Sequence, residues 1–439
     1  MTLTVSPDQP IDLQIGWPNP ALLPAPNLRH SATAVLSNPS IANPALLYGP
    51  DEGYEPLRIH IAAWLSNFYQ PREPVSSQRI CITGGASQNL ACVLQTFTDP
   101  VYTRNVWMIA PTYHLAARVM EDAGFAGRLR GIPEDDEGVD IAVLESGLRA
   151  AEDIALRAGN TEPKMKPPRP WRKIYKHIIY AVPTFANPSG KIMSLRRREA
   201  LVRLARQYDA LIVTDDVYDF LQWSPKEGEK NFGDRACVPR IVDVDRCLDG
   251  GPQDEWGHAL SNGSFSKLIG PGARTGWAEA SEKVAYGLSQ TGSSRSGGAP
   301  SHLCAAIIDQ LFPTGIIQDH IRGVLQPKYA ERYHTLLSAI QEYLVPLGVT
   351  VPAPATAAGG YFMWIGLPAP LLAADVVQRA QSEANLRLCA GDLFQVPDPQ
   401  VTDERFTDHL RLCFAWEEPR HLTEGMRRLA RVLHRMIRT

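Results

Sequence analysis

The sequence predicts an α/β protein: a large domain with a mostly parallel sheet between helices, followed by a smaller α+β domain. Short apolar runs alternate with amphipathic helices in the first half of the chain, which is the pattern of a parallel sheet covered on both faces. Farther along, strands and helices alternate less regularly. A length of 439 residues also exceeds what one small core can bury and indicates two domains.

The chain begins with about 50 residues rich in Pro, Asn and Ser, and this composition predicts an extended arm that lies on another part of the molecule. Hydrophobic periodicity then predicts a helix over 57–68, strands over 80–83, 106–109 and 178–182, a helix over 195–208 and a strand over 210–214. Gly84 and Gly85 separate the first strand from a helix that starts at Gln88. Ligands of parallel sheets bind at the carboxyl ends of the strands, so the loops after these strands are the predicted site.

The last third of the sequence predicts the elements of the smaller domain. They are a helix over 325–343, strands over 349–351, 361–365 and 410–414, a helix over 373–384 and a final basic helix from residue 422. A basic, proline-rich stretch over 158–173 is predicted to be a surface loop.

The composition is that of an ordinary globular protein, with 44% hydrophobic and 21% charged residues. A net charge of −3 gives no electrostatic reason to expect nucleic acid or an anionic membrane as partner. The seven cysteines include no CxxC pair and no Cys/His cluster with zinc spacing, which favours free thiols in a reduced, intracellular protein without a metal. No signal, transit or membrane-spanning pattern is found, so a cytoplasmic location is expected.

Lys267 lies in a segment suited to Schiff-base chemistry. Ser264 and Ser266 flank it, a Gly270-Pro271-Gly272 turn follows, and Arg274 comes next. An amine that forms an imine must be held still, and burial or a nearby cation must lower its pKa. Ser266 and Arg274 offer hydroxyl and guanidinium donors to a phosphate beside that imine. The alternative is a surface loop with a solvated lysine.

The segment Thr83-Gly84-Gly85-Ala86-Ser87-Gln88 is placed to bind an anion at the start of a helix. Glycines allow a close backbone approach, and the first N–H groups of a helix are unpaired and favour negative charge. Ser87 and Gln88 add side-chain donors. The alternative is a tight strand-to-helix turn without a ligand. A GxGxxG motif and a Walker lysine are absent.

Two further strand ends carry polar or aromatic groups. Tyr113 follows a strand, where its ring stacks on a planar heterocycle or packs in the core. Asn187, in Asn187-Pro188-Ser189-Gly190, either donates an amide N–H to a phenolate-type oxygen or belongs to an ordinary turn.

The strand over 210–214 delivers Asp215, Asp216 and Tyr218. A carboxylate there could keep a pyridinium nitrogen protonated, which makes such a ring an electron sink; surface acids are the alternative. Arg411 lies in an apolar run and therefore needs a partner. A substrate carboxylate is its best bidentate match, and a structural ion pair is the alternative.

Together these motifs, in this order, resemble the fold-type I pyridoxal-phosphate (PLP) enzymes, specifically the class I and II aminotransferases. The resemblance runs from about Gly16 to Trp416 and is strongest toward the branch of 2-aminoadipate and kynurenine aminotransferases and the effector domains of MocR-type regulators. Tyr48-Gly49-Pro50 and Gly359-Gly360-Tyr361-Phe362-Met363-Trp364 match segments of that branch. It implies a seven-stranded sheet in a large domain over 51–320, a small domain over 321–439, and an arm over 1–50 that joins the small domain and covers the active site.

The resemblance also implies the cofactor contacts. Lys267 would form the internal aldimine with PLP and carry the proton. Asp215 would pair with the ring nitrogen, Asn187 and Tyr218 would bind the 3′ oxygen, and Tyr113 would stack on the ring. The implied phosphate ligands are Gly85, Ala86, Ser87 or Gln88, Ser264, Ser266, Arg274 and Tyr48 of the partner subunit in a homodimer.

On the substrate side, the resemblance implies that Arg411 binds the α-carboxylate, with Asn187, Gly16 and Trp17 near the substrate. The departures are the insertion at 158–173, which has no counterpart, and Ala390-Gly391-Asp392, where the family often has Pro-Gly. The change at Ala390 would affect the substrate side of the small domain.

The expected activity is transfer of an amino group between an L-amino acid and a 2-oxo acid. The alternative is a PLP-dependent lyase, cyclase or decarboxylase, because the same electron sink serves those reactions. A regulator is disfavoured because no winged-helix segment precedes the domain. The side-chain specificity stays open: Arg29 or Arg295 binds a second carboxylate or is a surface charge, and Trp17, Tyr361 and Phe362 favour an aromatic or long side chain if they line the pocket.

Overall fold

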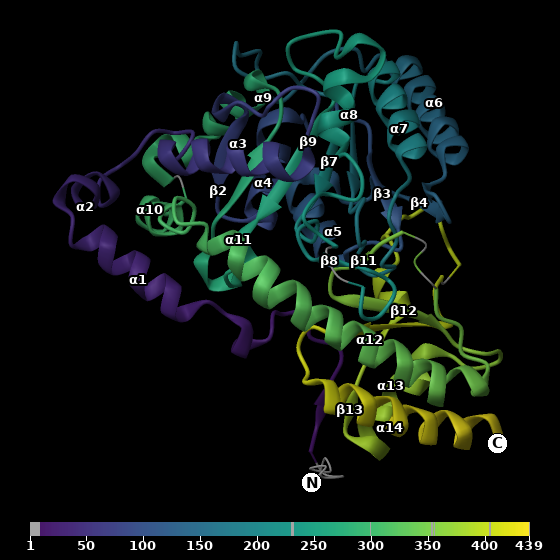
Figure 1. Ribbon diagram of the computed structural model, residues 1–439. Coiled ribbons are helices and arrows are strands. Elements are labelled where there is room, and N and C mark those ends of the chain that lie inside the picture. Colours follow the sequence, from purple (N-terminus) through teal and green to yellow (C-terminus); the bar gives the residue numbers. More distant parts are fainter. Residues whose placement is uncertain are drawn as a thin grey trace.

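The computed structural model describes residues 9–229, 232–298, 300–352, 354, 356–403 and 405–438. Its large domain is built on one eight-stranded sheet (Figure 1). In spatial order the strands are β2 (Ile80–Thr83), β10 (Gly276–Glu279), β9 (Ala259–Ser264), β7 (Ala210–Asp215), β6 (His177–Ala181), β3 (Val106–Ala110), β4 (Leu129–Asp135) and β5 (Gly138–Val139). The central pairs are parallel, whereas β10 is antiparallel to both of its neighbours and β5 to β4.

Helices cover both faces of this sheet because alternate residues of its strands are apolar on each side. Along β7, Leu211 and Val213 pack into one buried cluster and Ile212 into another. The first cluster includes α4 (Ala86–Phe97), α5 (His114–Met120) and α9 (Glu282–Ser289). The second includes α6 (Ile141–Arg157), α7 (Leu195–Gln207) and α8 (Ile241–Cys247).

A third cluster joins the two domains through α3 (Glu55–Tyr69) and the long helix α12 (Gln326–Tyr343). The small domain has a three-stranded antiparallel sheet with β15 between its neighbours. Its other elements are β12 (Phe362–Gly366), β15 (His409–Cys413), β14 (Cys389–Ala390), β13 (Leu386–Arg387), α13 (Ala373–Ala384) and α14 (Pro419–Arg438). A two-residue β8 (Gln222–Trp223) pairs with β11 (Ala358–Gly359) between the domains.

The N-terminal segment connects the two ends of the molecule. β1 (Ile11–Asp12) pairs in parallel with β13 of the small domain, and the chain then continues to α1 (Ala25–Leu36) and α2 (Pro39–Ala45), which project beside α10 (His302–Asp309) (Figure 1). Val35, Ala45 and Ala306 form a small buried cluster there. The segment therefore contacts both domains.

The expectation of an extended arm was wrong for its second half, and its residues 1–8 lie outside the described part of the chain. Prolines caused the error, because they suit the first turn of a helix, where the missing N–H costs nothing. Pro26 and Pro39 occupy such positions in α1 and α2, and the Asn38 side chain accepts a hydrogen bond from the N–H of Ser40 at 3.1 Å.

The α/β class and the sheet with flanking helices are confirmed. The seven longer strands of the main sheet are joined by β5, a two-residue hairpin strand. The strand expected over 349–351 is reduced to one bridge between Thr350 and Gly366. None of the described helices is both long and apolar enough to cross a membrane.

Candidate active site

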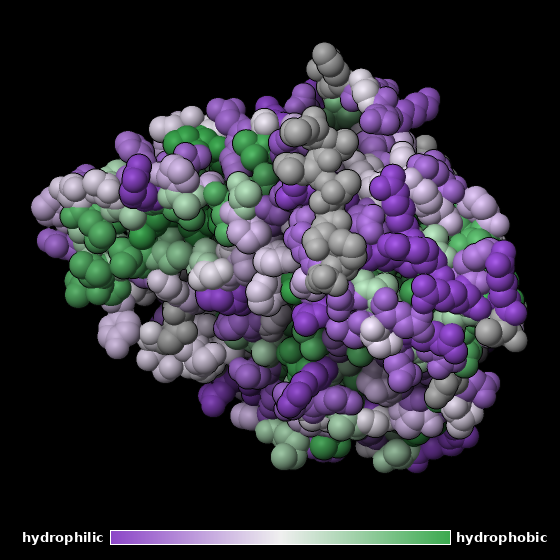
Figure 2. All heavy atoms as spheres, turned by 90° about the horizontal axis from the view of Figure 1, so that it is seen from below, coloured by the Kyte–Doolittle hydropathy of each residue, from purple (hydrophilic) through white to green (hydrophobic). Residues whose placement is uncertain are grey.

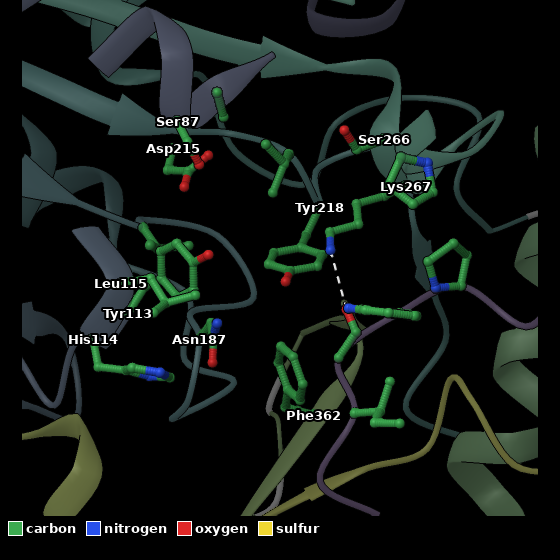
Figure 3. A pocket seen from close by; sticks show the side chains of 18 of the residues that line it. Ser87, Tyr113, His114, Leu115, Asn187, Asp215, Tyr218, Ser266, Lys267 and Phe362 are labelled. Atoms are coloured by element: carbon green, nitrogen blue, oxygen red, sulfur yellow. Dashed lines mark hydrogen bonds between the residues drawn. The ribbon is translucent and has the colours of Figure 1, made fainter. Parts of the chain in front are cut away.

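A cavity of about 560 Å³ opens at the carboxyl ends of the central strands, between the large domain, the small domain and the N-terminal segment (Figure 3). Parallel strands place their carboxyl ends at one edge, so polar residues after separate strands meet there. From the residues predicted as site residues the lining includes Gly16, Trp17, Ala86, Ser87, Tyr113, Asn187, Asp215, Tyr218, Ser264, Ser266, Lys267, Arg274 and Arg411.

Lys267 ends the short helical turn Phe265–Lys267 that follows β9, and its amine points into the cavity. The Lys267 Nζ donates to the carbonyl oxygen of Gly16 at 3.1 Å. It lies 5.8 Å from the centroid of the Tyr218 ring and 5.3 Å from that of Tyr361. Burial lowers the pKa of Lys267 to about 8, and the positive charge of Arg411 acts in the same direction. At pH 7 about one tenth of this amine is therefore uncharged, a far larger share than for a lysine with the ordinary pKa of 10.5.

Asp215 is the last residue of β7 and faces the same cavity. Its Oδ2 accepts a hydrogen bond from the Tyr180 hydroxyl at 3.1 Å, while its buried Oδ1 has no partner. Burial raises the pKa of Asp215 to about 7, and the neighbouring charge of Asp216 raises it further, against the opposing effects of Tyr180 and Lys267. A buried oxygen without a partner is costly, so this site favours a ligand that donates a hydrogen bond to it.

Aromatic and amide groups line the walls between Lys267 and Asp215. Tyr113 precedes α5 and Tyr218 follows β7, and burial raises the pKa of both hydroxyls, with the charge of Asp215 as a second cause. Both phenols therefore remain protonated and available as donors. Figure 3 shows the rings of Tyr113 and Tyr218 with Asn187 around the open space in front of the Lys267 amine.

The part of the cavity next to the start of α4 is shaped for an anion. Helix α4 begins at Ala86, so the N–H groups of its first turn point toward this part together with Ser87. Gly85 has φ +96°, and a Cβ added there would lie 2.9 Å from the Arg274 Nη2 atom. Arg274 itself has a left-handed φ of 44° and donates to the carbonyl oxygen of Gly84 at 2.9 Å. Such strain in a residue other than glycine is typical of ligand sites.

The two serines of the lysine segment complete this part of the cavity. The Ser264 hydroxyl donates to the Ser266 hydroxyl at 2.9 Å and accepts from the Ser266 N–H at 3.1 Å. This bonded pair keeps Ser266 facing the cavity.

Arg411 lies in the middle of β15 and is only 6% exposed. Its Nη1 donates to Asn187 Oδ1 at 3.1 Å and its Nη2 to the carbonyl oxygen of Gln14 at 2.6 Å, while its buried Nε has no partner. The guanidinium lies 4.1 Å from the centroid of the Phe362 ring. No carboxylate of the described residues pairs with it, so the alternative of a structural ion pair is not supported. The full charge is available to a bound anion.

Gly16 and Trp17 form the wall contributed by the N-terminal segment. A Cβ on Gly16 would lie 2.7 Å from the Phe362 ring, so only glycine brings the backbone this close to the amine. Trp17 is 61% exposed and its ring packs edge-on against Trp416 with 6.1 Å between centroids.

Three of the predicted cofactor ligands are not among the residues that line this cavity: Gly85, Gln88 and Tyr48. The Gln88 side chain accepts from the Gly84 N–H at 2.9 Å and donates to Cys92 Sγ at 3.0 Å, so it closes its own turn. Tyr48 lies on the projecting α1–α2 segment and is 88% exposed. Arg29 and Arg295 are likewise outside the cavity, and Arg295 pairs with Asp51.

Sequence reasoning missed several groups in and around the site, among them Tyr180, His114 and Arg387. Tyr180 belongs to the apolar strand β6 and donates to Asp215. The only signal in the sequence was its spacing of two residues from Ile178, which puts both side chains on the same face of the sheet. His114 follows Tyr113, and burial and the charge of Arg411 lower its pKa. Its ring packs on Phe394 with 5.5 Å between centroids. Arg387 lines the outer part of the cavity.

These groups fit pyridoxal phosphate. The unpartnered Asp215 Oδ1 suits a protonated ring nitrogen, the Lys267 amine with its lowered pKa suits the aldehyde, and the start of α4 with Arg274 suits the phosphate.

Comparison with known proteins agrees with this fit. The family model described as aminotransferase class I and II matches residues 22–429. An uncharacterized protein of Saccharomyces cerevisiae is 34% identical over 87% of each chain, and an aromatic-amino-acid aminotransferase of Thermococcus litoralis is 28% identical over 96% of this chain and 88% of its own.

The crystal structure of an α-aminoadipate aminotransferase, LysN of Thermus thermophilus, complexed with N-(5′-phosphopyridoxyl)-L-leucine, superimposes with a TM-score of 0.74 at 26% identity, over 98% of this chain and 93% of that one. The chain therefore belongs to the class I and II aminotransferases of fold type I, and it is a pyridoxal-phosphate-dependent aminotransferase that acts on amino acids and 2-oxo acids.

Proposed function

We propose that the cavity around Lys267 is the transamination site and that its residues act as follows. Bound pyridoxal phosphate supplies an aldehyde and an electron-accepting ring. The observation that carries the assignment is the convergence of three groups on one cavity: the amine of Lys267, the carboxylate of Asp215 and the guanidinium of Arg411.

Lys267 is the amine that attaches the cofactor and then moves a proton to and from the substrate Cα. A general base works best when its pKa lies near the working pH, and burial lowers the pKa of Lys267 to about 8. The bond to the Gly16 carbonyl holds the amine beside the Tyr218 and Tyr361 rings. Release of that bond frees Lys267 for each proton transfer.

Asp215 keeps the ring nitrogen protonated, with Tyr180 fixing the carboxylate from the other side. When the cofactor is bound, Tyr113 would stack on the ring, and Asn187 and Tyr218 would donate to its 3′ oxygen; all three line the cavity. The phosphate is held by Gly85, Ala86, Ser87, Ser264, Ser266 and Arg274. Supporting this division, the donors for the phosphate and the acceptor for the ring nitrogen line the same cavity.

Arg411 binds the substrate α-carboxylate. Its Nη2 now donates to the Gln14 carbonyl and its Nη1 to Asn187, and both are neutral acceptors that an anionic carboxylate can replace. Asn187 then remains next to the substrate, and Gly16 and Trp17 cover it. The planar fork on the face of Phe362 fixes the orientation of the carboxylate.

We propose further that the enzyme is a cytoplasmic homodimer. The projecting α1–α2 segment exposes Leu36, Leu46, Leu47 and Tyr48 by 53%, 63%, 70% and 88%. Figure 2 shows an apolar area on this projecting part. Contiguous exposed apolar groups mark interaction surfaces, and a second copy would cover them and bring its own Tyr48 to the phosphate end of this site. All seven cysteines are free, which supports a reducing compartment.

The assignment is tested on the purified holoenzyme. Borohydride reduction followed by peptide mapping is expected to place the cofactor on Lys267. Adding one amino acid without an acceptor is expected to convert the spectrum to that of the aminated cofactor and to release one 2-oxo acid. Labelling of another lysine would refute the site, and release of ammonia or CO₂ with each turnover would indicate a lyase or decarboxylase instead.

A further inference from the structure

Four lysine and arginine side chains of the described residues line the cavity: Lys267, Arg274, Arg387 and Arg411. The proposed function uses three of them, for the cofactor aldehyde, the phosphate and the α-carboxylate. Arg387 is left without a role, although it faces the same space.

The strands place Arg387 on the substrate side. Cys389 lies opposite Arg411 in the β14–β15 ladder, and Arg387 precedes Cys389 by two residues. Leu386 and Leu388 are buried in the core, whereas Arg387 and Cys389 line the cavity. Two residues of extended chain span about 7 Å, so Arg387 stands farther out than the group that binds the α-carboxylate.

The present partner of Arg387 is Asp12, its register neighbour in the β1–β13 pair, with 3.5 Å between Arg387 Nη1 and Asp12 Oδ2. The two ends of this ion pair differ in exposure and in their other hydrogen bonds. The Asp12 side chain is 14% exposed, and its Oδ1 accepts from the N–H groups of Gln14 and Ile15 at 2.9 and 3.0 Å. The Arg387 side chain is 55% exposed. Asp12 is held by its own turn, whereas the exposed Arg387 side chain has its hydrogen bond to Asp12 alone among the described residues.

A long, exposed ion pair stabilises a protein little, so leaving Asp12 costs Arg387 little. A second carboxylate on a bound substrate would offer a bidentate partner in a more enclosed place. Substrates with uncharged side chains would leave Arg387 on Asp12, where its charge is balanced. The same cavity can then accept both kinds of substrate.

Resting on the proposed function, we propose that Arg387 is the specificity-determining residue that binds the distal carboxylate of dicarboxylic amino acids and 2-oxo acids of five or six carbons, and that Asp12 holds it aside for substrates with uncharged side chains. Arg29 and Arg295 do not line the cavity of the single chain.

Binding of unreactive acids to the holoenzyme tests this without turnover. Glutarate has two carboxylates and pentanoate has one, and both can be titrated by the change in the cofactor spectrum. Arg387→Gln is expected to weaken glutarate binding about 10- to 100-fold, the range for losing hydrogen bonds to a charged group, and to change pentanoate binding less than about twofold. Arg379→Gln, at an exposed position of α13 outside the cavity, is the matched control and is expected to change neither.

The second variant removes the competitor. Asp12→Asn keeps an oxygen for the N–H groups of Gln14 and Ile15 but loses the charge, so glutarate binding is expected to tighten a few-fold. In half-reactions, Arg387→Gln is expected to raise the KM for glutamate but not the KM for leucine. The kcat for leucine is expected to be retained.

The proposal is overturned if Arg387→Gln weakens both acids equally, which indicates a structural role, or if it weakens neither, which indicates a surface charge. These outcomes can be told apart from failure of the proposed function. If the proposed function is wrong, the wild-type enzyme will not convert its cofactor with any amino acid. The ratio of glutarate to pentanoate binding will still report on Arg387.

Discussion

The Lys267 amine donates a hydrogen bond to the Gly16 carbonyl, across 251 residues of sequence, at 3.1 Å. This bond joins the N-terminal segment directly to the group that carries the chemistry. Gly16 can take this place because its lack of a side chain leaves room for the Phe362 ring. The segment thus belongs to the site itself, and its attachment to the small domain through β1 and β13 couples that domain to Lys267.

Attachment of the cofactor to the apoenzyme is expected to speed up as pH rises and to level off above about 8. Only the uncharged amine reacts with an aldehyde, and burial has lowered the pKa of Lys267 to about 8 from the 10.5 of a free lysine. Stopped-flow absorbance over pH 6–10 measures the rate. A rate that still climbs toward pH 10 would show that the amine is not perturbed.

The sequence predicted those site residues whose position follows from the sheet. Asp215 ends β7 and Lys267 follows β9, and any apolar strand of a parallel sheet delivers its next polar residue to the same edge. It did not predict Tyr180, because a tyrosine inside an apolar strand reads as core, which it also is. It overstated Gln88, because a side chain near a helix start can serve its own backbone as well as a ligand.

The helices α1 and α2 were hidden for a different reason. Their proline content resembles that of an extended segment, and their stability comes from packing on α10, which no local pattern reports. Arg387 was hidden because its role depends on the pairing of β1 with β13, strands more than 370 residues apart. Both the helices α1 and α2 and the position of Arg387 therefore depend on contacts between segments far apart in the sequence.

Asp215→Asn is expected to lower kcat/KM about 150- to 5,000-fold. The substitution removes one partner of a buried charge pair, a loss of about 3–5 kcal/mol, and leaves the ring nitrogen without its carboxylate. Steady-state kinetics at saturating cofactor measure the loss. Asp216→Asn is not a suitable control because Asp216 accepts from Thr214 and Ser261 in the core; Asp254→Asn, on an exposed loop, is suitable. An Asp215→Asn enzyme of wild-type activity would contradict the assignment.

The same substitution is expected to stabilise the apoenzyme at high pH. The folded pKa of Asp215 is raised to about 7 from 3.8, so the folded state binds the proton more tightly than the unfolded state. The contribution of Asp215 to the free energy of unfolding is therefore fully present below about pH 4 and is lost as the pH rises through about 7. The Tm of apo Asp215→Asn is expected to exceed that of apo wild type at pH 8 and to match it near pH 4. A difference that grows as pH falls would reverse the sign and reject the buried, unpaired carboxylate.

Arg411→Lys is expected to raise KM for every amino acid by about 10- to 100-fold while leaving cofactor attachment intact. Lysine keeps the charge but loses the planar fork that lies on Phe362 and would engage both carboxylate oxygens. Initial rates with amino acids are compared with those for the corresponding amines, which lack the α-carboxylate. The comparison separates loss of carboxylate binding from a structural effect of the substitution. The amines should be equally poor with both enzymes, and a parallel loss for amines would assign Arg411 a structural role.

Leu46→Asp combined with Leu47→Asp is expected to shift the enzyme from dimer to monomer. Both side chains are more than half exposed in the single chain, and two charges in an apolar interface are strongly unfavourable. Light scattering after size exclusion measures the mass. The monomer should also bind the cofactor more weakly, because Tyr48 of the partner would be lost from the phosphate end; a monomeric wild type would refute the shared site.

Gly85→Ala is expected to weaken cofactor binding through the phosphate alone. The added Cβ would lie 2.9 Å from Arg274 Nη2, and the φ of +96° is strained for alanine. Gly127→Ala is the matched control, because Gly127 has φ +76° and nothing within 4 Å of the added carbon, so it carries the backbone strain without the contact.

Affinities for pyridoxal phosphate and for pyridoxal, which lacks the phosphate, separate the effect on the phosphate site from an effect on the fold. We expect about a tenfold loss for the phosphate ester in Gly85→Ala, no change for pyridoxal, and wild-type values for Gly127→Ala. Equal losses for both compounds would mean that the substitution disturbs the fold of the strand-to-helix turn and that the Gly85–Arg274 contact does not shape the anion site.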